Sequence, residues 1–421
     1  MPAATRLSAL DGLRGVAALV VVVHHALLVS PSMAAAYYGG SVGDDPLHVA
    51  LAYSPLHLLW GGAEAVVVFF VLSGFVLARQ VRSRSFDWFA YFPSRLLRLY
   101  LPVIAAVAFA YAIMLLPHDG APDSPWLDRD AGYPFGAILQ DVTLLGGVSG
   151  VVSPLWTLRW EVIFSLLLPI AAYAARLIPA WLLGAACVVL STVGAARDVA
   201  ALQYLPIFGV GVAIEGEWDR IGRIVDRISR RAGWLVWTAV LAVATVLLSM
   251  HWLLVLPLGH AATVMLAQGP IVVGAGILVI AAVHCTPVRR LLTWRPIALL
   301  GAISFSLYLI HEPLVILMAN VTDAARWTVL AAVPLALATA WVFWLVVERP
   351  AHHLARTVRA RAVWHPPADA GARQQPGSDG APGEPGPVRD RAPGTGFATT
   401  PDTMGPSVHD GAARERTPAH R

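Results

Sequence analysis

The chain has 421 residues, of which 57% are hydrophobic and only 13% are charged, and its formal net charge is +4. Soluble domains carry roughly 25% charged residues, so this composition excludes an ordinary soluble protein. Apolar runs of about 20 residues recur along most of the length, which is typical of a polytopic α-helical membrane protein. The basic residues gather beside these runs, a pattern that indicates membrane topology rather than nucleic-acid binding.

Ten segments meet the apolar length needed to cross a bilayer. They are residues 10–29, 56–78, 98–116, 154–175, 179–196, 199–215, 233–256, 260–283, 296–318 and 327–347. Arginine-rich stretches alternate with loops that lack basic residues or are acidic, as in "HDGAPDSPWLDRD". By the positive-inside rule, an even number of spans then leaves both termini in the cytoplasm.

The composition divides the chain into a transmembrane domain, residues 1–350, and a tail, residues 351–421. From about Arg361 the tail is rich in Pro, Gly, Ala and Arg and has little apolar surface. Such a segment cannot offset its chain entropy by burial, so we expect a disordered cytoplasmic tail. The two cysteines, Cys187 and Cys285, lie in or beside apolar segments, and we expect buried thiols without a disulfide or a metal site.

The first apolar run contains ionisable residues that a bilayer does not readily accept. Asp11 and Arg14 stand near its start, and His24 and His25 stand in its middle. At about 100° per residue, Arg14 and His25 share a helix face and differ in depth by roughly 16 Å. His24 points about 100° away, and we leave it out of the site. A mid-membrane imidazole such as His25 serves either as a helix–helix hydrogen-bond partner or as a general base near neutral pH.

An arginine pair stands at the cytoplasmic end of the third candidate span, in "FPSRLLRLYLP". Arg95 and Arg98 are three positions apart, so both guanidinium groups project from one helix face. Each guanidinium can hold two phosphate oxygens in a fork. The alternative is an ordinary interfacial anchor.

Acidic residues mark two further spans. The stretch "GGAEAVVVFFVLSGFVLA" places Glu64 near the outer end of the second span and Ser73 and Gly74 farther in. The glycine serves either helix packing or the approach of a ligand. The stretch "SPLWTLRWEVIFSLLLP" places Glu161 in the outer part of the fourth span, where a carboxylate needs a partner or a cavity.

The ninth span contains the stretch "GAISFSLYLIHEPLVI". Ser304, Tyr308 and His311 follow one another at spacings of four and three, so they line one side of the helix. Pro313 predicts a kink just beyond them. This side of the helix therefore offers two hydroxyls and an imidazole at membrane depth.

In this order the motifs resemble those of the acyltransferase 3 family of integral-membrane O-acyltransferases, over about residues 7–350. They are "LDGLRG" leading to a mid-helix histidine, "FFVLSGF", Arg-x-x-Arg, Trp-x-Leu-x-x-Glu and "SLYLIHEPL". The resemblance implies transfer of an acyl group, commonly acetyl, from cytoplasmic acyl-coenzyme A to a hydroxyl of a carbohydrate or a glycosylated small molecule. It implies a plasma- or inner-membrane enzyme whose coenzyme is a co-substrate rather than a tightly bound cofactor, and a cell-envelope glycan or a macrolide-type antibiotic as the acceptor.

The resemblance also implies roles for residues that match the family's motifs. Arg14, Arg95 and Arg98 are expected to hold the coenzyme phosphates at the cytoplasmic mouth. The pantetheine arm would then run along the first helix to His25, which acts as a general base or takes the acyl group transiently. Glu161, together with His311, would hold the acceptor or orient the imidazole.

Further substrate contacts are expected from Asp11, Glu64, Ser73, Tyr308 and His311. Where the family often has an acidic residue before the Phe-Phe pair, this chain has Val67, with Glu64 one turn earlier. A proton-coupled transporter or permease is the alternative function, because intramembrane His, Glu and Arg also build relays and substrate paths. The sequence does not predict an oligomeric state.

Overall fold

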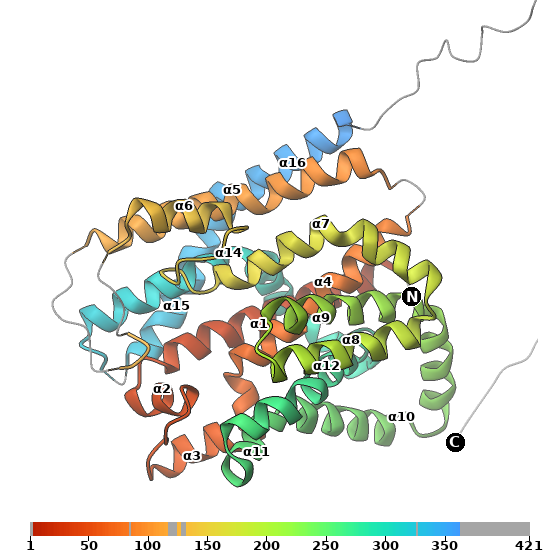
Figure 1. Cartoon of the computed structure of the whole chain (residues 1–421), viewed down its shortest axis with the longest axis horizontal. Helices are drawn as coiled ribbons and strands as arrows, with labels where there is room; N and C mark the ends of the chain where they lie inside the picture. Colours follow the sequence, from red (N-terminus) through yellow and green to blue (C-terminus); the bar gives the residue numbers. More distant parts are fainter. Residues whose placement is uncertain (1–2, 84–85, 117–123, 128–131, 326, 363–421) are drawn as a thin grey trace, which may run out of the picture. The chain divides into compact units, whose positions relative to one another are not determined.

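The computed structural model describes residues 3–83, 86–116, 124–127, 132–325 and 327–362. Within these ranges the chain is helical and contains no strand, as predicted (Figure 1). The helices are α1 (Ala3–Leu27), α2 (Pro31–Tyr37), α3 (Pro46–Tyr53), η1 (Pro55–Leu59), α4 (Gly62–Val81), α5 (Trp88–Met114), α6 (Phe135–Thr143), α7 (Leu155–Leu177), α8 (Ala180–Ala196), α9 (Ala200–Gly216), α10 (Trp218–Leu248), α11 (Met250–Leu258), α12 (His260–His284), α13 (Thr286–Leu292), α14 (Arg295–Val321), α15 (Thr328–Phe343), η2 (Trp344–Glu348) and α16 (Arg349–Ala362).

The ten predicted spans all coincide with helices, but not all of these are long enough to cross a bilayer alone. Among the described residues, seven helical segments have the necessary length and apolarity, and there are eight if the pair α10–α11, bent by 49°, is one span. The apolar helices α8 and α9 have only 17 residues each. The count of ten crossings and the cytoplasmic position of both termini therefore stay predictions.

Helices α1 and α14 pack backbone to backbone near their first halves. A Cβ atom on Gly15 would lie 2.4 Å from the Gly301 nitrogen, and one on Gly301 would lie 2.5 Å from the Asp11 carbonyl oxygen. Only glycine permits so close an approach, which is how small residues join membrane helices. The crossing sets the polar start of α1 beside the polar side of α14.

The segment that leads into α7 reaches deep into the bundle. Asp141, fully buried, accepts hydrogen bonds from the Tyr133 hydroxyl at 2.5 Å and from the nitrogen and hydroxyl of Ser149 at 2.6 Å each. A few residues on, the nitrogen and hydroxyl of Ser153 donate to the buried carboxylate of Glu312, at 2.5 and 2.6 Å. Glu312 lies nine residues before α14 ends at Val321, which is about 14 Å of helix. Helix α7 therefore begins inside the bundle, beside the buried carboxylate of Glu312.

The bundle does not end at the boundary predicted after residue 350. The π-helix η2 follows α15, and α16 continues to Ala362 and packs along α5 (Figure 1). A π-turn widens the helix locally and often accompanies functional sites. The first part of the predicted tail is thus a packed helix, whereas residues 363–421 lie outside the described part of the chain.

Candidate active site

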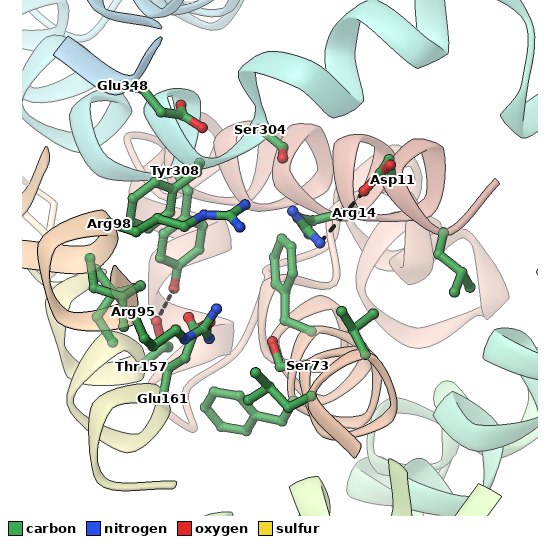
Figure 2. Close-up of a pocket in the computed structure, with 18 of the residues that line it drawn as sticks. Asp11, Arg14, Ser73, Arg95, Arg98, Thr157, Glu161, Ser304, Tyr308 and Glu348 are labelled. Atoms are coloured by element: carbon green, nitrogen blue, oxygen red, sulfur yellow. Dashed lines mark hydrogen bonds and ion pairs between the residues drawn. The ribbon is translucent and has the colours of Figure 1, made fainter. Parts of the chain in front are cut away.

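A cavity of about 330 Å³ opens between α1, α4, α5, α7, α14 and the junction of η2 with α16 (Figure 2). It brings together side chains from all the stretches singled out in the sequence. The predicted residues that line it are Asp11, Arg14, Ser73, Arg95, Arg98, Glu161, Ser304 and Tyr308. Thr157, Glu348 and His352 line it as well, and the sequence analysis missed all three.

Arg95 and Glu161 form an ion pair across α5 and α7. The Arg95 Nη2 atom donates to Glu161 Oε1 at 2.6 Å, and its Nε donates to the Ser165 hydroxyl at 3.3 Å. The side chain of Asp87 accepts from the nitrogens of Phe89 and Ala90 and so caps α5, which fixes where Arg95 emerges two turns later. Glu161 thus faces the arginine cluster, and its position in the outer part of the span stays a prediction.

The other two arginines face the same space from opposite sides of the cavity (Figure 2). Arg14 Nη2 lies 3.6 Å from Asp11 Oδ1, one turn earlier on α1. Arg98 donates its Nε–H to His352 Nε2 at 3.0 Å, which ties α5 to α16. Because that imidazole nitrogen accepts a hydrogen bond through its lone pair, it carries no proton and His352 is neutral in this contact.

Glu348 supplies a third carboxylate. It is buried at the end of η2 and accepts hydrogen bonds from the nitrogen and hydroxyl of Ser306, at 3.1 and 2.5 Å. The sequence signal was an acidic residue at the end of the last apolar run, in "WLVVERP". The cavity lining now holds three arginines (Arg14, Arg95, Arg98) and three carboxylates (Asp11, Glu161, Glu348), so its formal charge is balanced.

His25 and His311 form a direct hydrogen bond, with His25 Nδ1 and His311 Nε2 2.8 Å apart. His311 Nδ1 lies 3.0 Å from the Leu307 carbonyl oxygen, which only accepts, so this nitrogen holds the proton. In the neutral ring the His311 Nε2 then has the lone pair and accepts from His25 Nδ1–H. The chain of contacts leaves the basic lone pair of His25 on its Nε2. The His25 ring also stacks on Trp126, with the ring centroids 5.5 Å apart.

The lining of the cavity includes neither His25 nor His311. The Tyr308 side chain, which does line the cavity, packs in a buried cluster with Ala17, Val21 and Ala65. The Tyr308 hydroxyl and Thr157 Oγ1 share a hydrogen bond of 2.8 Å, and the Tyr308 ring lies 6.0 Å from that of His311 (Figure 2). The expected open path along the first helix from Arg14 to His25 is therefore closed at Tyr308.

Glu64 does not join these residues, because it belongs to a second buried cluster. Its Oε2 lies 3.4 Å from His57 Nε2, and the two side chains are 5% and 1% exposed. His24 donates its Nδ1–H to the Trp60 carbonyl at 2.9 Å and stacks on the Trp60 ring, outside the cavity lining, as expected. The sequence analysis missed His57, which stands in a short helix rather than a span.

Among the described residues, no group of three or more His, Cys, Asp or Glu side chains is placed to hold a metal ion. Cys187 and Cys285 are both buried and free.

Comparison with known proteins gives one family. The protein-family model described as an acyltransferase domain, that of acyltransferase 3, matches residues 7–346, which include every residue that lines the cavity except Glu348 and His352. No curated protein and no solved structure matches the chain.

Proposed function

The chain belongs to the acyltransferase 3 family of membrane acyltransferases, and on that premise we propose that it transfers an acyl group, such as acetyl, from acyl-coenzyme A to a hydroxyl of a carbohydrate or glycosylated small molecule. The acceptor is a cell-envelope glycan or a macrolide-type antibiotic, and the enzyme works in the cell membrane. The observation that supports this most directly is the hydrogen-bonded series from the Leu307 carbonyl through His311 to His25.

In the proposed reaction, His25 Nε2 accepts the proton of the acceptor hydroxyl. The acceptor oxygen forms a bond to the thioester carbonyl carbon, the carbon–sulfur bond breaks, and the coenzyme thiolate leaves and takes the proton. As His25 gains positive charge, its Nδ1–H bond to His311 strengthens, because a charged donor makes a stronger hydrogen bond. His311 is thus a positioning residue that fixes the tautomer and orientation of His25.

A second route uses the same nitrogen. His25 Nε2 attacks the thioester carbonyl, the carbon–sulfur bond breaks and the thiolate leaves. The acceptor oxygen then bonds to the acyl carbon, the carbon–nitrogen bond to His25 breaks, and the hydroxyl proton passes to the coenzyme thiolate. Purified protein mixed with radiolabelled acyl-coenzyme A and no acceptor separates the two routes. Label that stays on the protein after rapid denaturation, and that His25→Ala abolishes, identifies the acyl-imidazole. The absence of such label supports the general base.

The cavity is the route by which the thioester approaches. Its apolar lining and the hydroxyls of Ser73 and Ser304 suit an uncharged pantetheine arm. Delivery to His25 requires the Tyr308 side chain to swing away from Thr157, which breaks one hydrogen bond between neutral groups. The loss of this hydrogen bond costs about 1–3 kcal/mol while the buried hydroxyls lack partners. Glu161 forms an ion pair with Arg95, so its proposed role is to position the arginine cluster and not to orient His25.

The test is acyl transfer by purified protein in detergent, with radiolabelled acyl-coenzyme A and a panel of carbohydrates and glycosides. The wild-type protein should transfer the label, and His25→Ala should lose at least a hundredfold in kcat, roughly the contribution of a general base. His24→Gln is the matched control, because the amide can still donate to the Trp60 carbonyl. Full transfer by His25→Ala would refute the mechanism, and solute uptake by proteoliposomes without any acyl transfer would favour a permease.

A further inference from the structure

The charge balance of the cavity raises the question of where the coenzyme phosphates bind. The three arginines of that cavity face three carboxylates, and Arg95 and Arg14 are already paired with Glu161 and Asp11. Phosphates that entered this space would have to displace or approach carboxylates. Like charges in a partly dehydrated site repel strongly, so the cavity favours an uncharged ligand segment over a polyanion.

A second cavity of about 320 Å³ adjoins the first and has a different charge. The two share Gln80, Arg95, Arg98 and His352 in their linings. The second adds three arginines from the start of α16 onward, Arg349, Arg356 and Arg359, and its lining residues include no Asp or Glu. Of its five lining arginines, Arg95 is paired with Glu161, and the other four make this the most cationic of the cavities described, at the mouth of the route to His25.

The basic residues of α16 that line this cavity are spaced along the sequence so that they lie on one side of the helix. Arg349, His352, Arg356 and Arg359 follow at intervals of three, four and three, so they share one helix face, toward α5. Arg361, two positions further on, is exposed and does not line the cavity. Arginine forks hold phosphate oxygens in pairs, which gives this face the geometry for a diphosphate and a phosphomonoester.

The same cavity offers aromatic surface and a buried polar group. Trp344 lines it, with the Arg349 guanidinium 5.1 Å from the centre of the ring. Tyr91 lines it too, with a side chain only 1% exposed, and its hydroxyl lies near Ser165 without a well-formed hydrogen bond. A nucleobase stacks on such rings and on guanidinium planes, and its polar edge needs a buried partner. Inorganic phosphate or a lipid headgroup would use only the arginines.

We propose that the α16 cavity binds the 3′-phosphoadenosine 5′-diphosphate end of acyl-coenzyme A, with the phosphates on Arg356 and Arg359 and the base against Trp344. The pantetheine arm then passes Arg98 into the charge-balanced cavity and ends at Tyr308. This rests on the proposed function. It moves the phosphates from Arg14, Arg95 and Arg98, where they were expected, to a helix beyond the residues that the family model matches.

The experiment compares R356Q/R359Q with the matched control R361Q, in phospholipid-free detergent. The double variant should raise the KM for acyl-coenzyme A by on the order of tenfold or more with little change in kcat, since it loses charge-assisted hydrogen bonds to phosphate. R361Q should behave as wild type. With S-acylpantetheine, which lacks the nucleotide, wild type and double variant should have the same KM. Adenosine 3′,5′-bisphosphate should inhibit the wild type competitively and the double variant about tenfold more weakly.

Direct binding keeps this proposal separate from the proposed function. Equilibrium binding of radiolabelled adenosine 3′,5′-bisphosphate needs no catalysis, so a wild-type protein that transfers no acyl group yet binds the bisphosphate through Arg356 and Arg359 would refute the function and keep the site. Acyl transfer with an unchanged KM in R356Q/R359Q would overturn the site and keep the function. An equal effect of R361Q, or an effect confined to nanodiscs of anionic lipid, would also overturn it, because the arginines would then act through general charge or bind headgroups.

Discussion

Substitution of His311 by leucine tests the central arrangement of the site. Leucine fills a similar volume at a fully buried position but accepts no hydrogen bond, so the Nδ1–H of His25 loses its partner 2.8 Å away. In the transition state that proton belongs to a developing imidazolium, and a hydrogen bond to a charged group contributes about 1.5–3 kcal/mol. At about 1.4 kcal/mol per factor of ten, kcat should fall roughly 10- to 150-fold.

The KM for both substrates should stay nearly constant, because the lost interaction strengthens only as charge develops on His25. His311→Gln is the rescue variant, since its amide oxygen can accept from His25 Nδ1, and it should recover most of the lost rate. Initial rates of acyl transfer at saturating donor and acceptor give kcat. Size-exclusion elution and the midpoint of thermal unfolding in detergent show whether each variant is folded.

A folded His311→Leu protein with wild-type kcat would refute the assignment of His311 as the residue that orients His25. A loss of rate shared equally by His311→Gln and His311→Leu would also refute it, because the hydrogen-bond acceptor would then be irrelevant.

Three other predictions concern Glu161, a helix crossing and a loop. Glu161→Gln should raise the KM for acyl-coenzyme A by about three- to tenfold with kcat unchanged, because it weakens the ion pair that positions Arg95. A fall in kcat of a hundredfold or more would instead identify Glu161 as a catalytic residue. Gly74→Ala should lower the free energy of unfolding by about 1–3 kcal/mol, because the added Cβ would lie 1.9 Å from a backbone carbonyl oxygen. Thermal unfolding measures this change. The control is Gly136→Ala, which should change stability little because its Cβ meets nothing within 4 Å. Burial and a neighbouring carboxylate raise the pKa of Tyr133. The neutral phenol therefore contributes stability at pH values below about 10, the ordinary pKa of tyrosine, and this contribution declines as the pH rises above 10. Tyr133→Phe should weaken the pH dependence of thermal unfolding above pH 10, and a profile identical to the wild type would contradict this.

The helical architecture and most of the cavity were predictable from the sequence because the membrane makes polar residues informative. An arginine or carboxylate inside an apolar run has few acceptable positions, and a protein-lined cavity is the commonest. Arg14, Arg95, Arg98 and Tyr308 stood out for that reason, and they all line the cavity. The glycine in "LSGF" was left open between packing and ligand approach, and its contact with the α9 backbone decides for packing.

The position of Glu161 beside Arg95 was not predictable, because it depends on where the loop before α7 places the start of that helix in the bundle. That loop reads as a solvent-exposed connection, yet the carboxylates of Asp141 and Glu312 hold it inside the bundle. Local periodicity describes one helix at a time and does not encode where a second helix starts relative to the first.

Partners far apart in the chain were equally hidden. No pattern in the sequence indicated that Glu64 would pair with His57 rather than face the cavity, or that Tyr308 would stand between the cavity and His25. The basic face of α16 was obscured because its composition merges into that of the tail. These contacts arise from the three-dimensional packing of distant segments, which the spacing of residues within one segment does not specify.

The hydrogen bond between His25 and His311 joins residues 286 positions apart, and this has a consequence for biosynthesis. At a translation rate of roughly 5–20 residues per second, about 15–60 s pass between the emergence of the two histidines from the ribosome. Throughout that interval the first helix is already made, but its imidazole has no oriented proton acceptor from α14. A chain that stalls, or that is released before the ninth predicted span is inserted, therefore lacks the hydrogen bond between His25 and His311. Under the proposed mechanism, catalytic competence appears only when nearly the whole bundle has been assembled, so the enzyme is silent while it is being made.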